Sequence, residues 1–172
     1  CSIGAGGGLA SGGGNGFCFT ALDASVHDNS ALFGPTGPGT GALVVSFDNH
    51  QDGGDPNDNH IELLYNGVSI ATVTPSFTLD DDVWRRVHIE QTDGAVFVNV
   101  YDASDNVVAS IGPSFPPILP RRFRFGFGSS SGTAQNVVQL DQIELRTFSF
   151  DYNVDLNGNG TLDACEGSAP VV

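Results

Sequence analysis

Two dipeptides, Asn66-Gly67 and Asp93-Gly94, each separate a pair of short runs in which apolar and polar residues alternate. Asn-Gly and Asp-Gly favour the tight turns of β-hairpins, because the central turn positions need positive φ values. Alternation with a period of two places every second side chain on the same face of a strand. The sequence therefore predicts two antiparallel hairpins, over residues 61–73 and 83–101.

The rest of the chain repeats this pattern. Short runs rich in Val, Ile, Phe and Thr are bounded by Gly, Pro, Asn and Asp, and no run of useful length shows a helical period. Roughly nine strands at this spacing indicate two packed antiparallel sheets. A chain of 172 residues with 40% hydrophobic residues suits one domain with its own core. We therefore expect an all-β sandwich.

Two strands near the end of this region carry specific expectations. A strand over 122–128 alternates Arg and Phe, so that three phenylalanines share one face: Phe123, Phe125 and Phe127. The last strand is expected over 137–148, with Ile143 and Leu145 pointing inward. The leader over 4–16 is almost entirely Gly, Ala and Ser, and it is expected to form an irregular loop.

The charge of the chain limits its partners. The formal net charge is -14, from 20 acidic residues against 6 arginines, with no lysine. A phosphate backbone would be repelled over most of such a surface, so nucleic acid is not an expected partner. No apolar window reaches the roughly 18 residues of a membrane-spanning helix. Most of the acids are Asp in loops with Asn and Gly, which is how proteins build oxygen cages for Ca²⁺.

The segment 47–60 concentrates these ligand types. It holds four Asp, three Asn and two His between two predicted strands. Ca²⁺ takes 6 to 8 oxygen ligands, and carboxylates, amide oxygens and backbone carbonyls of one loop can supply them. The alternative is a solvated acidic loop, because Asp and Asn also favour turns.

The C-terminal segment 155–166 has the spacing of a twelve-residue calcium loop. Oxygen donors stand at positions 1, 3 and 5, Gly160 provides the turn at position 6, and acids stand at positions 9 and 12. The alternative is a turn rich in Asn and Gly. The predicted metal-binding residues of this loop are Asp155, Asn157, Asn159, Thr161, Asp163 and Glu166.

Three cysteines are too few for a disulfide scaffold, and an odd number leaves one thiol free or paired between chains. Cys18 stands between two phenylalanines and is interpreted as a small buried core residue. Cys1 and Cys165 remain as the expected disulfide pair. Because the chain contains no methionine, we expect it to be cut from a longer precursor.

Residues 14–148 resemble the concanavalin A-like, or L-type, lectin superfamily in register along the chain. The resemblance covers short motifs and the Gly-rich turn that ends at Gly41. The motifs are Asn15-Gly16-Phe17-Cys18-Phe19, Val44-Val45-Ser46-Phe47-Asp48, Asp55-Pro56, His60-Ile61, Trp84-Arg85-Arg86-Val87-His88-Ile89 and Phe125-Gly126-Phe127-Gly128-Ser129-Ser130. The C-terminal loop is similar to the single calcium-loop tails of dockerin-like bacterial surface proteins.

The resemblance implies a two-sheet antiparallel jelly-roll sandwich with a calcium site and a carbohydrate site. The implied metal residues are Asp48, Asp52 and Asp55 through their side chains, His50 through its backbone, and His60 at a transition-metal position. The implied carbohydrate-binding residues are Asn15, Gly41, Ser129 and Ser130. Asn15 stands where the family has Asp, and Ser46 where it has a metal-binding Glu. The first change weakens sugar binding, and the second weakens the transition-metal site.

We therefore expect a lectin-like sandwich over residues 1–150 and a calcium-loop tail over 151–172. The expected function is calcium-dependent glycan binding outside the cell or at its surface. The alternative is a structural subunit of a calcium-stabilised filament, in which an open sheet edge accepts the tail 168–172 of a neighbouring copy. We expect no enzymatic activity, because the Glu-x-Asp-x-x-Glu motif of glycosidases on this fold is absent.

Overall fold

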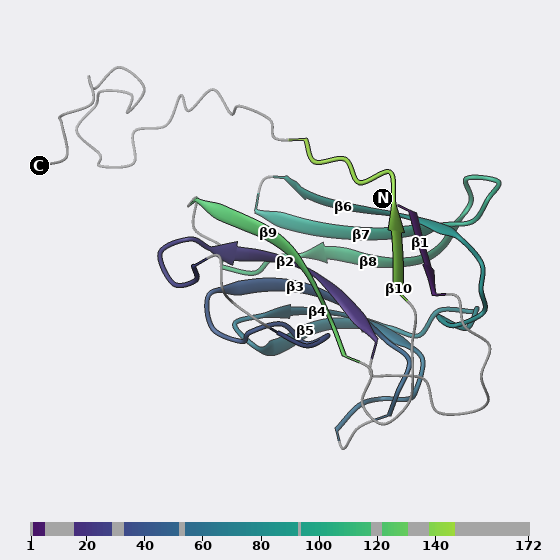
Figure 1. Ribbon diagram of the computed structural model, residues 1–172, viewed down its shortest axis with the longest axis horizontal. Helices are drawn as coiled ribbons and strands as arrows, with labels where there is room; N and C mark the ends of the chain where they lie inside the picture. Colours follow the sequence, from purple (N-terminus) through teal and green to yellow (C-terminus); the bar gives the residue numbers. More distant parts are fainter. Residues whose placement is uncertain are drawn as a thin grey trace, which may run out of the picture.

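The chain forms two five-stranded antiparallel sheets (Figure 1). The computed structural model describes residues 2–5, 16–28, 33–51, 54–92, 94–117, 122–130 and 138–146. These ranges contain strands and no helix. The strands are β1 (Ser2–Ala5), β2 (Phe17–Asp23), β3 (Ala42–Asp48), β4 (His60–Tyr65), β5 (Val68–Val73), β6 (Arg85–Thr92), β7 (Ala95–Tyr101), β8 (Val107–Ser114), β9 (Phe123–Ser129) and β10 (Val138–Asp141). One sheet has the order β10-β1-β6-β7-β8, and the other β5-β4-β3-β2-β9. The prediction of an all-β sandwich is confirmed.

Both predicted hairpins form. β4 and β5 pair across Asn66 and Gly67, whose φ values of 53° and 76° fit a two-residue hairpin turn. β6 and β7 pair with Val87 opposite Val100 and Ile89 opposite Val98. Their turn contains Gly94 with a φ of 77°. The turn chemistry and the alternation therefore set both pairings.

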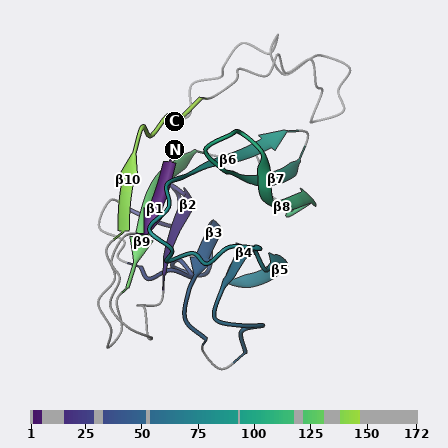
Figure 2. The same cartoon turned by 90° about the vertical axis from the view of Figure 1, so that its right-hand side faces the viewer.

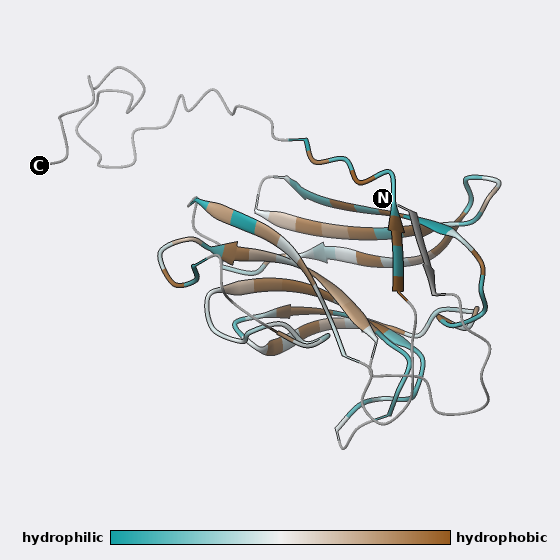
Figure 3. Ribbon diagram, viewed as in Figure 1, coloured by the Kyte–Doolittle hydropathy of each residue, from teal (hydrophilic) through white to brown (hydrophobic). Residues whose placement is uncertain are grey.

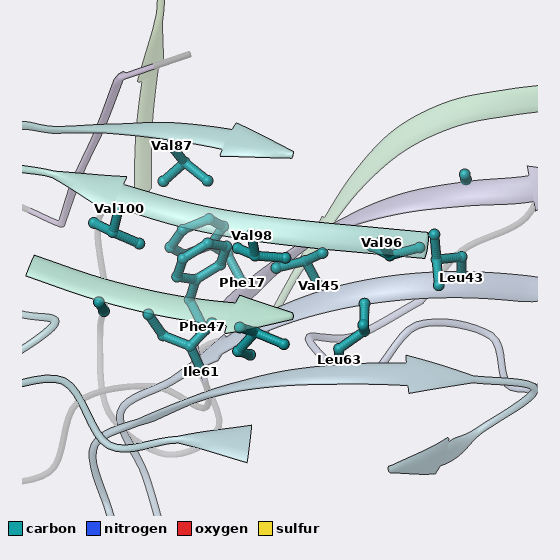
Figure 4. Close-up of a cluster of buried hydrophobic side chains, with 13 residues drawn as sticks. Phe17, Leu43, Val45, Phe47, Ile61, Leu63, Val87, Val96, Val98 and Val100 are labelled. Atoms are coloured by element: carbon teal, nitrogen blue, oxygen red, sulfur yellow. The ribbon is translucent and has the colours of Figure 1, made fainter. Parts of the chain in front are cut away.

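The main core lies between the inner faces of the two sheets (Figure 4). Phe17 and Phe47 stack there, with 4.7 Å between ring centroids, against a set of aliphatic side chains from both sheets. Figure 3 shows that apolar residues are concentrated on the strands and polar residues on the connections. Figure 2 shows the layers from the end, with β6, β7 and β8 on one side and β3, β4 and β5 on the other.

A second, smaller core covers the outer face of the sheet that contains β2 and β3. Cys18 and Val44 are fully buried there, with Phe33 packed against them. The Gly-rich turn lies close to these residues, since the Cys18 thiol donates to the Gly34 carbonyl at 3.4 Å and a Cβ on Gly37 would lie 2.5 Å from a Val44 methyl. This covering explains why all seven residues of β3 are buried.

The ends of the sandwich differ from the predictions. The last strand was expected over 137–148, but β10 ends at Asp141. Gln142 follows with a φ of 51°, which breaks the extended conformation, and Ile143 and Leu145 are 57% and 56% exposed. The prediction that these two side chains point inward is therefore wrong. The leader over 4–16 was expected to be irregular, but its first two residues, Gly4 and Ala5, belong to β1 (Ser2–Ala5), which lies between β6 and β10. Residues 6–15 of the leader lie outside the described residues.

The expectation that three phenylalanines share one face of β9 is confirmed. Phe125 pairs with Ala21 and Phe127 with Phe19, so these side chains lie on the inner face of the sheet. Even so, Phe125 is 44% and Phe127 39% exposed. The inner face is therefore incompletely covered at this edge of the sandwich.

Candidate functional site

The candidate site lies where β3 ends and β4 begins. Asp48, the last residue of β3, pairs with His60, the first residue of β4. Both are buried, with 5% and 1% of their surface exposed. Because the strands are antiparallel, the whole polar connection 49–59 starts and returns at one end of the sheet.

The Asp48 carboxylate fixes the start of this connection. Its Oδ1 accepts a hydrogen bond from the His50 backbone N–H at 2.8 Å. The neighbouring Asn49 Oδ1 is buried without a hydrogen-bond partner among the described residues. A buried amide oxygen without a partner is costly, and such an oxygen beside a buried carboxylate is a donor set suited to a hard cation.

The far end of the connection is held by amide side chains. The Asn59 backbone N–H donates to Asn57 Oδ1 at 2.8 Å. The Asn59 amide donates to the Phe77 carbonyl at 2.7 Å, and its oxygen accepts from the Leu79 N–H at 2.8 Å. Asn59 is therefore used to attach the loop to the segment before β6.

His60 is oriented by the same loop. Its Nδ1 lies 3.0 Å from the Asn57 carbonyl oxygen, so Nδ1 donates a hydrogen bond to that oxygen. Nε2 is then the ring nitrogen that could bind a metal. Ser46 is buried two residues before Asp48, and its hydroxyl has no partner among the residues described.

The predicted metal ligands of the sandwich are only partly within the described ranges. Asp48 and His60 are buried at the strand ends, and His50 and Asp55 are half-buried in the loop. Asp52 lies outside the described residues. Within the described residues, no three or more His, Cys, Asp or Glu side chains are grouped so that they could hold a metal ion. The carboxylate and amide oxygens of these residues are of the kind that Ca²⁺ takes as ligands, and the calcium site stays a prediction.

Two of the predicted carbohydrate-binding residues lie at this same end. Ser129, the last residue of β9, pairs with Phe17, and the Ser130 N–H donates to the Gly16 carbonyl at 3.4 Å. Gly16 in turn lies against the end of β3, because a Cβ there would stand 3.0 Å from the Asp48 Cα. Asp48, Gly16 and Ser130 are thus brought together. Asn15 lies outside the described residues.

Gly41 is placed differently from the prediction. Its carbonyl accepts from the Asp23 N–H at 2.8 Å, which puts it beside the C-terminal end of β2, whereas Ser129 lies beside the N-terminal end. The grouping of Gly41 with Ser129 and Ser130 is therefore wrong. A Cβ on Gly34, at the other end of the turn, would lie 4.0 Å from the Ser130 Cβ. Antiparallel pairing could have shown this, because the residue before β3 must lie beside the end of β2.

The remaining predicted sites lie outside the described residues. They are the calcium-loop ligands Asp155, Asn157, Asn159, Thr161, Asp163 and Glu166 and the expected disulfide pair Cys1 and Cys165. Cys18 is a free, fully buried cysteine, as predicted. Burial raises its thiol pKa to about 11.

Comparison with known proteins supports the fold. No protein-family profile matches the chain, and no curated protein matches it. The structure is similar to a solved structure of peanut lectin with a nine-residue peptide, with a TM-score of 0.62 and 19% sequence identity. The alignment covers 80% of this chain and 64% of the lectin chain, so the chain spans less than two thirds of the lectin. The sandwich therefore has the jelly-roll fold of concanavalin A-like lectins.

The described part of the chain has no helix long and apolar enough to cross a membrane.

Proposed function

We propose that the chain is an extracellular lectin-like module that binds glycans in a calcium-dependent way. The observation that carries this proposal is the grouping of Asp48, Gly16 and Ser130 at one end of a lectin-type sandwich. Three segments far apart in the sequence meet there. The similarity to peanut lectin supports the same conclusion through the fold.

The proposed site combines a hydrogen-bond acceptor held in place, the Asp48 carboxylate, with the hydroxyl groups of Ser129 and Ser130. A bound Ca²⁺ would supply charge neutralisation for the carboxylates of the loop 48–55. Ser129 is exposed and Ser130 half-buried, so their hydroxyls are accessible to a sugar hydroxyl. The Asp48 carboxylate already accepts one backbone N–H, which holds it in place at the strand end.

Catalysis is not part of the proposal. Glycoside hydrolysis needs two carboxyl groups facing each other across the bound sugar. Three of the four glutamates fall in separate strands or segments, Glu62 in β4, Glu90 in β6 and Glu144 after β10.

A glycan array with the full chain tests the proposal. We expect binding to a restricted set of glycans in Ca²⁺, loss of that binding in a chelator, and loss of it in Asp48→Asn. Asp102→Asn is the control, because Asp102 is a half-buried aspartate of the β7–β8 turn, where its carboxylate accepts from the Ser104 and Asn106 backbone N–H groups. An array without a calcium-dependent signal for the wild-type chain would overturn the proposal.

A further inference from the structure

Negative charge is concentrated beside the proposed glycan site. The loop over 48–58 contains four Asp and neither arginine nor lysine. One bound Ca²⁺ would offset two of these four charges, so the loop keeps a net negative charge when calcium is bound. Asp58 is exposed and is not among the predicted calcium ligands, so calcium binding does not use its carboxylate. An anionic ligand at this end of the sandwich would therefore meet like charge.

The positions of the arginines decide whether a cation could compensate for this charge. The chain has six arginines and no lysine, and histidine is the only other side chain in it that can carry a positive charge. Three arginines form ion pairs: Arg85 with Asp81, Arg86 with Asp105 and Arg146 with Glu144. The charge of each of these three is offset locally by its own partner.

Two further arginines lie at the opposite end of the sheet from the site. Arg124 donates to the carbonyl groups of Ala24 and His27, just beyond the end of β2. The Arg122 carbonyl accepts from the Ala24 N–H at the same end. Ser129 lies instead beside the first residue of β2, and a strand of this length spans roughly 20 Å. Both arginines are therefore about one strand length away from the proposed site.

The two ends of this sheet are well separated in space. In Figure 1 the connection from β3 to β4 lies at the lower right, and the residues that directly follow β2 lie at the left. The sixth arginine, Arg121, lies outside the described residues and directly precedes Arg122 in the sequence. The described arginines thus either pair with acids of their own or belong to the far end of the sheet. None of them is placed to receive an anionic group of a glycan bound near Asp48.

We propose that the site selects glycans by charge: it binds uncharged sugars and excludes sugars that carry sulfate, carboxylate or phosphate groups. This inference rests on the proposed function and adds the class of glycan to it. Asp58 determines part of the selectivity, because its exposed carboxylate repels an anionic group of the ligand. Repulsion of this kind excludes a wrong ligand without any new contact to the right one.

Pairs of glycans that differ by a single sulfate group test the proposal on the full chain. The array is read in Ca²⁺ at about pH 8, above the range in which histidine usually titrates. In about 0.02 M NaCl, each neutral glycan that binds should bind at least about tenfold more tightly than its sulfated partner. The difference should shrink in about 0.5 M NaCl, because salt screens the repulsion between charges.

The outcomes of this array separate charge selection from the proposed function. Equal binding of neutral and sulfated partners at low salt would overturn charge selection. A difference of the same size at high salt would also overturn it, because a steric misfit does not depend on salt. A calcium-dependent signal confined to anionic glycans would overturn charge selection and keep the proposed function. The absence of any calcium-dependent signal would overturn the proposed function, and charge selection with it.

Substitutions at Asp58 test the source of the repulsion. Asp58→Asn removes one negative charge, and Asp58→Lys replaces it by a positive one. The control is Glu90→Lys, which makes the same change in net charge as Asp58→Lys at an exposed position of β6 in the other sheet.

The quantity compared is the ratio of the affinities for the neutral and the sulfated partner, so a general loss of affinity does not affect it. At low salt this ratio should fall from wild type to Asp58→Asn and again to Asp58→Lys, by about two- to threefold in total. Glu90→Lys should keep the wild-type ratio. An unchanged ratio in Asp58→Lys, or an equal fall in Glu90→Lys, would overturn the role of Asp58.

Discussion

Asp48 and His60 face each other as the last residue of β3 and the first residue of β4, and both are buried. A buried carboxylate is unfavourable unless hydrogen bonds or a cation compensate for its lost hydration. One hydrogen bond comes from the His50 N–H. This relationship between two strand ends is the structural basis of the proposed calcium site.

Removal of calcium is expected to destabilise the protein. The loop 48–58 contains four Asp, whose carboxylates repel each other without a cation, and a ligand that binds only the folded state stabilises that state. We expect a chelator to lower the melting temperature of the wild-type chain by about 5–10 °C. Differential scanning calorimetry with and without Ca²⁺ measures this. An unchanged melting temperature would mean that no cation is bound in the folded state.

Substitution of Gly16 should disturb both the fold and the proposed site. A Cβ at this position would lie 2.0 Å from the Phe47 carbonyl oxygen, and the φ of 89° is unfavourable for other residues. We expect Gly16→Ala to lower the free energy of unfolding by about 2–4 kcal/mol. Gly94→Ala is the control, because its φ of 77° is also positive but no atom lies within 4 Å of the added Cβ.

The control variant should lose only about 1 kcal/mol from backbone strain. Urea unfolding followed by fluorescence compares the two variants. Equal losses would show that the close approach of Gly16 to β3 does not matter for stability.

Cys18 should be unreactive in the folded protein. The side chain is fully buried, and desolvation raises its pKa to about 11, so the thiolate fraction near pH 8 is small. We expect a thiol reagent to modify Cys18 only after unfolding in denaturant, as measured by mass spectrometry of the peptide that contains it. Rapid modification of the native protein would contradict the burial of this residue beneath the Gly-rich turn.

The Asp81–Arg85 ion pair should make stability depend on pH. The Arg85 guanidinium donates to both Asp81 oxygens and holds the Asp81 pKa below its usual value of 3.8. A lowered folded-state pKa gives a contribution that is complete above the unfolded value and is lost as pH falls through the folded one. Asp81→Asn should therefore cost up to about 1 kcal/mol at pH 7 and progressively less below pH 3.8.

Urea unfolding of wild type and Asp81→Asn at several pH values checks this prediction. Asp80→Asn is the matched control, since Asp80 is the exposed neighbour. A difference between wild type and Asp81→Asn that stays constant down to the most acidic pH would exclude the ion pair as its cause.

The sheet framework could be predicted from local patterns. Asn66-Gly67 marked a turn, and alternation placed Val87 opposite Val100. Both signals are local, because turn conformation and the period of a strand depend on neighbouring residues. The end of β10 could not be predicted this way, because Ile143 and Leu145 continue the alternation while the backbone leaves the sheet at Gln142.

The site could be predicted only in part. The polar loop after Asp48 is visible as a cluster of ligand-type residues, and the structure places Ser130 and Gly16 beside it. Gly41 was grouped wrongly because the Gly-rich turn contains several glycines that the sequence alone does not distinguish. Only the pairing of β2 with β3 shows at which end of the sheet each of them lies. The exposure of Phe125 and Phe127 could not be predicted from the sequence either, because it depends on which strand covers them.

The most direct measurement of the central claim is calorimetric titration of Ca²⁺ into the metal-free protein and two variants. Wild type should bind calcium at the sandwich loop and at the C-terminal loop. Asp48→Asn should lose the first site and keep the second, and Asp155→Asn should do the reverse. A wild-type isotherm that Asp48→Asn reproduces unchanged would contradict a calcium site at the end of β3, and with it the calcium-dependent glycan site proposed there.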